Sequence, residues 1–291
     1  MRFEREKHVL QELIHYDVAV QKDGEPLSFD DINYLTREEA SRVLLQAKQA
    51  MNASETRAVY REALDASDAF WKDALASWAP EDGYREAFAE VSVRGMEFTE
   101  YMGVLKALMS RGEDAAPGEE PEHFCAPELE GLAENEKVSI EAMGMYGGPV
   151  ASVVRVDPTL AVPVEDRDGF KNMIVGTSRL LDGTERHDVA IHQFHPVEGG
   201  FDLRLYVEFP CTVPQEMAEG HSMHLALEFL GGLESAVRFR REHAAQATAK
   251  AWVSTCTSMR TSSRIDMARG EPCSVAIPRS SRAGCASPTW R

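Results

Sequence analysis

The feature that most constrains the fold is a change of hydrophobic period near residue 138. From there on, turn sequences such as Asp182-Gly183-Thr184 and Glu198-Gly199-Gly200 separate short runs of alternating apolar and polar residues, a pattern typical of β-hairpins. Because no helical segment lies between these runs, they predict an antiparallel sheet and argue against βαβ units. The expected strands are residues 138–143, 149–156, 172–181, 187–195 and 201–209.

The residues before this meander have mainly the period of helices. Thr36 and Glu39 have the spacing of a capping box at the start of one helix. A second helix is expected from Ser54 to Trp78, where apolar residues recur every three to four positions. A short strand at residues 87–93 and a further helix after Thr99 follow before the meander begins.

One long helix is predicted from Pro214 to Arg241. Helices, then a meander, then a long C-terminal helix suit an α+β fold whose antiparallel sheet grips that helix around a cavity, the helix-grip architecture. We therefore expect a helical N-terminal region at residues 1–82, of which residues 1–35 carry few signals, and a helix-grip domain at residues 83–245. The tail, residues 254–291, has six Arg against two acidic residues and no apolar period, so we expect a disordered extension, or a shifted reading frame, without chemistry.

The charge and the cysteines exclude several classes of protein. A formal net charge of -17 would repel nucleic acid and anionic membranes, so neither is expected as a partner. No apolar run is long enough to span a membrane and the N-terminus lacks the apolar segment of a signal peptide, so we expect a cytoplasmic protein. The five Cys form no CxxC pattern, so any metal must be held by His and carboxylate.

The strongest candidate for chemistry lies within the predicted C-terminal helix, from His221 to Glu228. His224 and Glu228 are four residues apart and would lie on one face of the helix, with His221 one turn earlier. Imidazole and carboxylate together suit zinc better than calcium or magnesium. The alternative interpretation is a surface helix with ordinary polar residues.

A catalytic zinc site needs further ligands from distant parts of the chain. His123, beside the apolar Phe124, is the best third ligand, and Glu141 is the preferred fourth because it interrupts an otherwise apolar strand. Glu136 is the second choice for that position. Among the other histidines, the alternation of a strand places His187 and His195 on one face and His192 on the other.

Three segments resemble the zinc hydrolase family of diacetylphloroglucinol hydrolase and phloretin hydrolase. The first is Gly83-Tyr84 followed by residues 91–102, which is similar to that family's strand, turn and aromatic helix. The second is Pro121-Glu122-His123-Phe124, which resembles its Pro-x-x-His ligand segment. The third is the run from His224 to Phe229 with Leu233 behind it, which resembles its HxxxE helix.

The resemblance implies a Bet v 1-like helix-grip core with one zinc ion, for which His123, His224, Glu228 and, more loosely, Glu141 match the ligands. It also implies hydrolysis of a carbon–carbon bond between a phenolic ring and an acyl group. Zinc would polarise the acyl carbonyl or acidify a bound water, and the ring carbon would need a proton from a general acid. The candidates for that role are His192, His195 and Tyr146.

Other functions use the same cavity. The protein could be a metal-free carrier of an aromatic ligand or a polyketide cyclase, in which the histidines only pack. Residues 36–112 alone would suit a helical interaction protein, and a heme held by His221 or His224 is a further alternative. The expected partner is a small aromatic substrate, with a homodimer as a possible assembly. The chain has none of the GxGxxG, GxxxxGK[ST], HExxH or GxSxG motifs.

Overall fold

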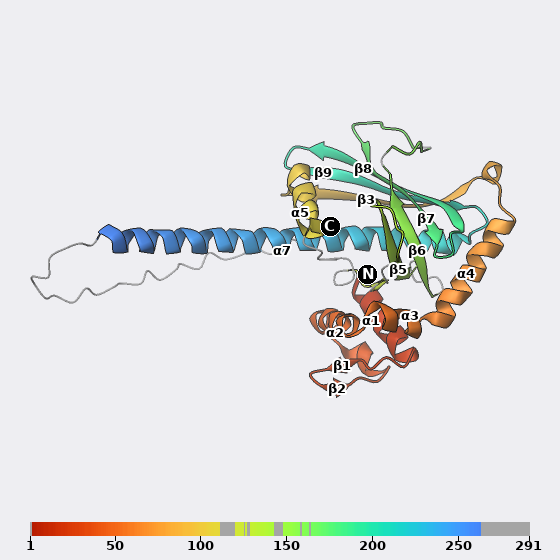
Figure 1. Ribbon diagram of the computed structural model, residues 1–291, viewed down its shortest axis with the longest axis horizontal. Coiled ribbons are helices and arrows are strands. Elements are labelled where there is room, and N and C mark those ends of the chain that lie inside the picture. Colours follow the sequence, from red (N-terminus) through yellow and green to blue (C-terminus); the bar gives the residue numbers. More distant parts are fainter. Residues whose placement is uncertain are drawn as a thin grey trace, which may run out of the picture. The chain divides into compact units, whose positions relative to one another are not determined.

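Figure 1 shows the computed structural model of the chain, in which residues 2–110, 120–124, 126, 129–142, 148–157, 159–162 and 164–262 are described. Contacts divide the chain after His243, and the fold and site described here belong to the unit that ends at that residue. Among the described residues, no helix combines the length and the apolar character that a membrane crossing needs.

The centre of this unit is an antiparallel sheet. Seven strands of the described residues form it, in the spatial order β3-β9-β8-β7-β6-β5-β4, and it curves strongly (Figure 1). The predicted meander is confirmed, since β5 to β9 follow one another in space, and Gly183 and Gly199 have positive φ at the two predicted turns. The strands are β3 (Tyr84–Arg94), β4 (His123–Phe124), β5 (Glu136–Ala142), β6 (Pro149–Val156), β7 (Lys171–Leu180), β8 (Glu185–Val197) and β9 (Gly200–Pro210).

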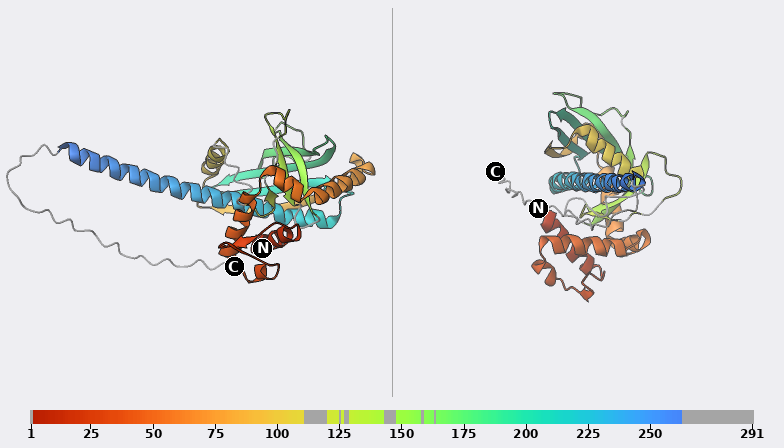
Figure 2. Two further views of the ribbon diagram at one scale, coloured as in Figure 1. Left: turned by 60° about the horizontal axis from the view of Figure 1, so that its bottom comes forward. Right: turned by 90° about the vertical axis from the view of Figure 1, so that its left-hand side faces the viewer.

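The long helix α7 (Gln215–Ser262) packs on the inner face of this curved sheet through its part before residue 244 (Figures 1 and 2). Its apolar residues share one core with residues of β3, β8, β9 and α5 (Phe98–Ser110). Aromatic rings dominate this core, because Phe194, Phe201 and Phe229 lie within 6.4 Å of one another, measured between ring centroids. The predicted α+β arrangement of sheet and C-terminal helix is therefore present.

A second core joins the N-terminal helices to the sheet. Val9, Leu10 and Leu13 of α1 are buried with residues of α2, and this cluster reaches Phe124 of β4 and Ile140 of β5. The predicted capping box is confirmed at the start of α2, where the Thr36 and Glu39 side chains each accept the other's backbone N–H. The elements are α1 (Arg2–His15), β1 (Gln21–Lys22), β2 (Glu25–Pro26), η1 (Asp31–Tyr34), α2 (Arg37–Ala50), α3 (Ala53–Val59), α4 (Arg61–Ala76) and η2 (Pro80–Asp82).

The structure corrects the expectation of one helix from Ser54 to Trp78. That segment is two helices, α3 and α4, which meet at Tyr60, whose backbone leaves the helical region (φ -92, ψ 11). Tyr60 is fully buried, and its ring packs against those of Tyr16 and Phe124. Packing of this ring against two distant segments therefore accounts for the boundary between α3 and α4. No sequence pattern near Tyr60 predicts that boundary.

The two ends of the chain contain helical residues that the sequence analysis did not specify. Residues 1–35 contain the well-packed helix α1, whose Val9, Leu10 and Leu13 have helical spacing. The C-terminal helix continues beyond Arg241 to Ser262, so the first residues of the expected tail are helical. The rest of that tail, residues 263–291, lies outside the described residues, as does Met143 at the end of the expected strand.

The packing of α7 on the sheet predicts a difference between two leucines of the same helix. Leu225 is 3% exposed and belongs to the core, whereas Leu230 is 42% exposed. We expect Leu225→Ala to lower the free energy of unfolding by about 2–5 kcal/mol, because it leaves a cavity. Leu230→Ala should change it by less than about 0.5 kcal/mol, and urea unfolding of both variants would reveal equal losses if α7 did not pack as described.

Candidate functional site

A cavity of about 290 Å³ lies between the inner face of the sheet and α7. All four residues that the sequence indicates as metal ligands line it: His123, Glu141, His224 and Glu228. Its remaining walls include the apolar side chains of Val154, Ile174, Val207, Phe209 and Leu225. The wall of the cavity therefore combines apolar side chains with a cluster of imidazoles and carboxylates.

Local geometry explains why these four side chains meet. His123 of β4 and Glu141 of β5 are paired residues of neighbouring antiparallel strands, and directly opposed residues point to the same face. Lys137 and Ser139 alternate with the apolar residues Val138 and Ile140 and line the cavity with Glu141. His224 and Glu228 are one turn apart on α7, which places both over that face of the sheet.

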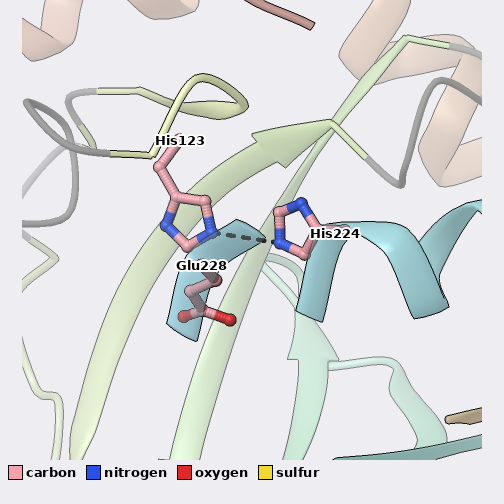
Figure 3. A group of neighbouring side chains, drawn as sticks. All are labelled: His123, His224 and Glu228. Atoms are coloured by element: carbon pink, nitrogen blue, oxygen red, sulfur yellow. Dashed lines mark hydrogen bonds between the residues drawn. The ribbon is translucent and has the colours of Figure 1, made fainter. Parts of the chain in front are cut away.

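The distances within the cluster are short. The Nε2 atoms of His123 and His224 lie 3.2 Å apart, and Figure 3 shows the two rings turned toward each other with Glu228 beside them. A carboxylate oxygen of Glu141 lies 3.1 Å from the His123 Nε2 atom and 3.8 Å from the His224 Nε2 atom. Ligand atoms of His123, His224 and Glu228 all lie within 4.8 Å of one another.

Two of these separations fit a tetrahedral metal ion. At metal–ligand bonds of about 2.0–2.1 Å, the ligand atoms of a tetrahedral zinc ion lie about 3.3 Å apart. The imidazole pair at 3.2 Å and the His123–Glu141 pair at 3.1 Å are close to that value. Side chains from the edge strand β4, from the neighbouring strand β5 and from helix α7 thus offer nitrogen and oxygen donors around one point beside the cavity.

Glu122 orients the imidazole of His224 through the Nδ1 atom of that ring. Its carboxylate accepts a hydrogen bond from the Nδ1 atom of His224 at 2.8 Å and lies 2.7 Å from the guanidinium of Arg5 in α1. With Nδ1 engaged as a donor to Glu122, the Nε2 atom of His224 faces the Nε2 atom of His123. Outer carboxylates commonly orient metal-binding histidines in this way.

The segment that carries His123 is held by a buried lysine. Lys48 of α2 is 5% exposed, and its Nζ atom donates to the main-chain carbonyls of Glu120 and His123 at 2.7 and 2.6 Å. The N-terminal helices therefore fix this segment through two cations, Arg5 and Lys48. The backbone of β4 is thus held by a hydrogen bond at His123 as well as by side-chain packing.

Surplus negative charge surrounds His224. Burial by itself would lower the pKa of His224, but hydrogen bonding to Glu122 and the charges of Glu141, Glu120 and Glu228 raise it to about 10. Burial, followed by the charge of His224, keeps the pKa of His123 well below its usual range. The site favours a positive charge at this point, whether from a proton or from a metal cation.

A second group of possible ligands shares His224. Glu120 and Glu122 are both buried and lie within 4.8 Å of its ring nitrogen. Arg5 already pairs with Glu122, and neither carboxylate lines the cavity. These buried His and Glu groups could hold a metal ion, but the group formed by His123, His224 and Glu228 is the one that a substrate in the cavity could reach.

The residues suggested as proton donors are separated by the fold. His192 lines the cavity, and no hydrogen-bond partner is found for its Nδ1 atom among the described residues. His195 lies outside the lining and packs against Phe170, as the strand alternation predicts. Tyr146 lies outside the described residues. Glu136, the second choice for a fourth ligand, pairs with Arg179 at 3.1 Å and does not line the cavity.

Sequence reasoning did not identify the supporting residues. Glu122 directly precedes the candidate ligand His123, and this position is only a weak indication of a supporting role. No sequence pattern indicates such a role for Arg5 or Lys48, because their partners are distant in sequence. Arg186 and Asp188 alternate with His192 along β8, and this period could have placed them on the cavity side.

The contacts of Glu122 with Arg5 and His224 predict a large loss of stability when Arg5 is replaced. Arg5→Met would leave Glu122, which is fully buried, without one of its two cations, and we expect a loss of about 3–5 kcal/mol in the free energy of unfolding. Lys7→Met on the same helix is the control, since Lys7 bonds an exposed carbonyl of Asn33. Equal effects of the two variants on urea unfolding would contradict the assignment.

The raised pKa of His224 predicts a pH dependence for metal-free protein. Because its pKa is about 10 in the folded chain against an ordinary 6.5, protonated His224 contributes its full stabilisation below pH 6.5 and loses it as the pH rises through 10. The destabilisation caused by His224→Gln should therefore shrink between pH 6.5 and pH 10. Urea unfolding of both chelator-treated proteins measures this, and a constant difference would count against a charged His224.

Comparison with known proteins does not identify a family for this chain. No family model matches the chain, and no curated protein and no solved structure matches it either. The chemistry of the site is therefore inferred from its side chains.

Proposed function

We propose that the protein is a zinc-dependent hydrolase that cleaves a carbon–carbon bond between a phenolic ring and an acyl group, on a Bet v 1-like helix-grip fold. The zinc would be held by His123, His224, Glu228 and Glu141. The observation that carries the proposal is the 3.2 Å approach of two Nε2 atoms beside a carboxylate oxygen, in the wall of an apolar cavity.

The donor set favours zinc over other common metals. Two imidazoles with carboxylates are typical of zinc, whereas calcium and magnesium prefer oxygen ligands alone. The hydrogen bond between Glu122 and His224 supplies the outer carboxylate that such sites use. The resemblance of three segments to the diacetylphloroglucinol and phloretin hydrolases points to the same ligands.

The cavity suits a small aromatic substrate. Its volume of about 290 Å³ lies near the lower end of the range for small-molecule sites. Val154, Ile174 and Val207 from three strands and Leu225 from α7 provide apolar walls that a ring could contact. An acylphenol would bury its ring against these walls with its acyl group at the His/Glu cluster.

Zinc, when bound, would polarise the acyl carbonyl and lower the pKa of water. The net reaction adds water across the bond, so the acyl carbon gains a hydroxyl group and the ring carbon gains a proton. Burial lowers the pKa of His192, which keeps this imidazole neutral near pH 7 and able to accept the proton of the attacking water. His192 would then return that proton to the ring carbon, as a general base followed by a general acid.

A metal-free carrier or cyclase remains the second candidate, because it needs the cavity alone. In that function the His/Glu cluster would be a buried polar network without a metal. Metal content separates the two proposals directly.

The test is elemental analysis of the purified full-length protein with variants. We expect about one zinc ion per chain in the wild type, as four converging ligands imply. His224→Ala and Glu228→Ala should lose the metal and the hydrolysis of an acylphenol while keeping the far-ultraviolet circular dichroism spectrum.

The matched control is Glu219→Ala, which removes an exposed carboxylate from the same helix and should retain both metal and activity. Stoichiometric zinc in His224→Ala would refute the ligand assignment. Wild-type protein that binds no zinc after reconstitution would favour the carrier or cyclase.

A further inference from the structure

A buried arginine lines the same cavity, away from the ligands already described. Arg186 of β8 is 1% exposed and is one of the largest fully buried side chains among the described residues. Its guanidinium stacks on the ring of Trp71, with the central carbon 3.9 Å from the ring centroid. Trp71 is itself fully buried, so the guanidinium is held in place by the core of the protein.

The hydrogen bonds of Arg186 are incomplete. One terminal nitrogen donates to the Ser152 hydroxyl at 2.7 Å, and the other lies 2.9 Å from a carboxylate oxygen of Asp188. The Nε atom finds no acceptor among the described residues. A buried guanidinium has five N–H donors, and leaving such donors without acceptors is costly, so this side chain has capacity for a further oxygen ligand.

The partner of Arg186 is already occupied by other donors. Asp188 accepts hydrogen bonds from the backbone N–H and the hydroxyl of Ser178, at 3.1 and 2.8 Å. Asp188 and Ser178 also line the cavity. These three residues therefore form a polar patch in the cavity wall, and the patch presents one positive group that can donate to a ligand.

The patch and the His/Glu cluster line the same cavity. Arg186, Asp188 and Ser178 share its wall with Glu141 and His221, and the volume of the cavity is about 290 Å³. A single small ring could therefore contact both groups of residues. The two groups would then have different roles. The His/Glu cluster would hold the reacting acyl carbon, and the patch with Arg186 would hold a substituent of the ring.

We propose that Arg186 is the anion-binding residue of this cavity and anchors a negatively charged oxygen of an aromatic ligand, either an ionised phenol or a carboxylate. The inference rests on the proposed function for the aromatic nature of the ligand. In the cleavage of an acylphenol, an ionised phenol oxygen donates electrons into the ring as the ring carbon takes up its proton, and the electron pair of the broken bond then returns to that oxygen. Arg186 stabilises that charge.

The experiment compares charged probes with neutral probes of the same shape. Isothermal titration calorimetry of the full-length protein measures 4-nitrophenolate against 4-nitroanisole, and benzoate against benzamide. We expect each anion to bind at least about tenfold more tightly than its neutral counterpart, the contribution of a charge-assisted hydrogen bond. The pair with the larger preference tells an ionised phenol from a carboxylate.

Variants assign the preference to Arg186. Arg186→Met should abolish it, whereas Asp188→Asn should increase it because the guanidinium loses its competing carboxylate. The control is Arg204→Met: Arg204 also stacks on an aromatic ring, that of Phe170 at 4.1 Å, but does not line the cavity. If Arg186→Met does not fold, Arg186→Lys replaces it, and this variant keeps the charge but loses the Nε donor, so the preference should fall.

Repeating the titration in the His224→Ala background separates this inference from the proposed function. A probe bound by a metal would lose its preference there, whereas a probe bound by Arg186 would keep it. The inference is overturned if wild-type protein binds neither anion, binds anions and neutral probes equally, or if Arg186→Met retains the preference. A preference shown by wild-type protein that binds no zinc after reconstitution would leave Arg186 assigned and the hydrolase proposal refuted.

Discussion

The buried carboxylate of Glu122 is the charge on which the arrangement of the molecule depends. An interior carboxylate is costly unless it is paired and hydrogen-bonded, and Glu122 has Arg5 on one side and His224 on the other. Helix α1, the segment before β4 and helix α7 are joined through this single group. The N-terminal helices thus take part in the site, because without Arg5 the orientation of His224 would depend on an unbalanced charge.

The parts of the structure that follow from local rules were predictable. Alternation and turn glycines at Gly183 and Gly199 identify the meander, because each strand of a hairpin is specified by its own residues and its turn. The four-residue spacing of His224 and Glu228 places them on one face of a helix, and alternation along β8 separates His192 from His195. In each case the periodicity of a single element determines the direction of a side chain.

The parts that depend on distant partners were not predictable. The break at Tyr60 exists because its ring packs against Tyr16 and Phe124, and no residue near Tyr60 indicates it. The pairings of Arg5 and Lys48 with the segment before β4 likewise join residues that have no common pattern. Tertiary contacts of this kind override local propensity, and they define the outer layer of the site.

The union of α1 and α7 through Glu122 has a consequence for how the chain matures. Glu122 and His224 are 102 positions apart, so the ribosome has made α1 and all seven strands of the described sheet before the imidazole exists. Until then the carboxylate has only Arg5 as a partner, and the cavity has no helix across it. A nascent chain interrupted before α7 would therefore lack His224, Glu228 and the helical wall of the cavity.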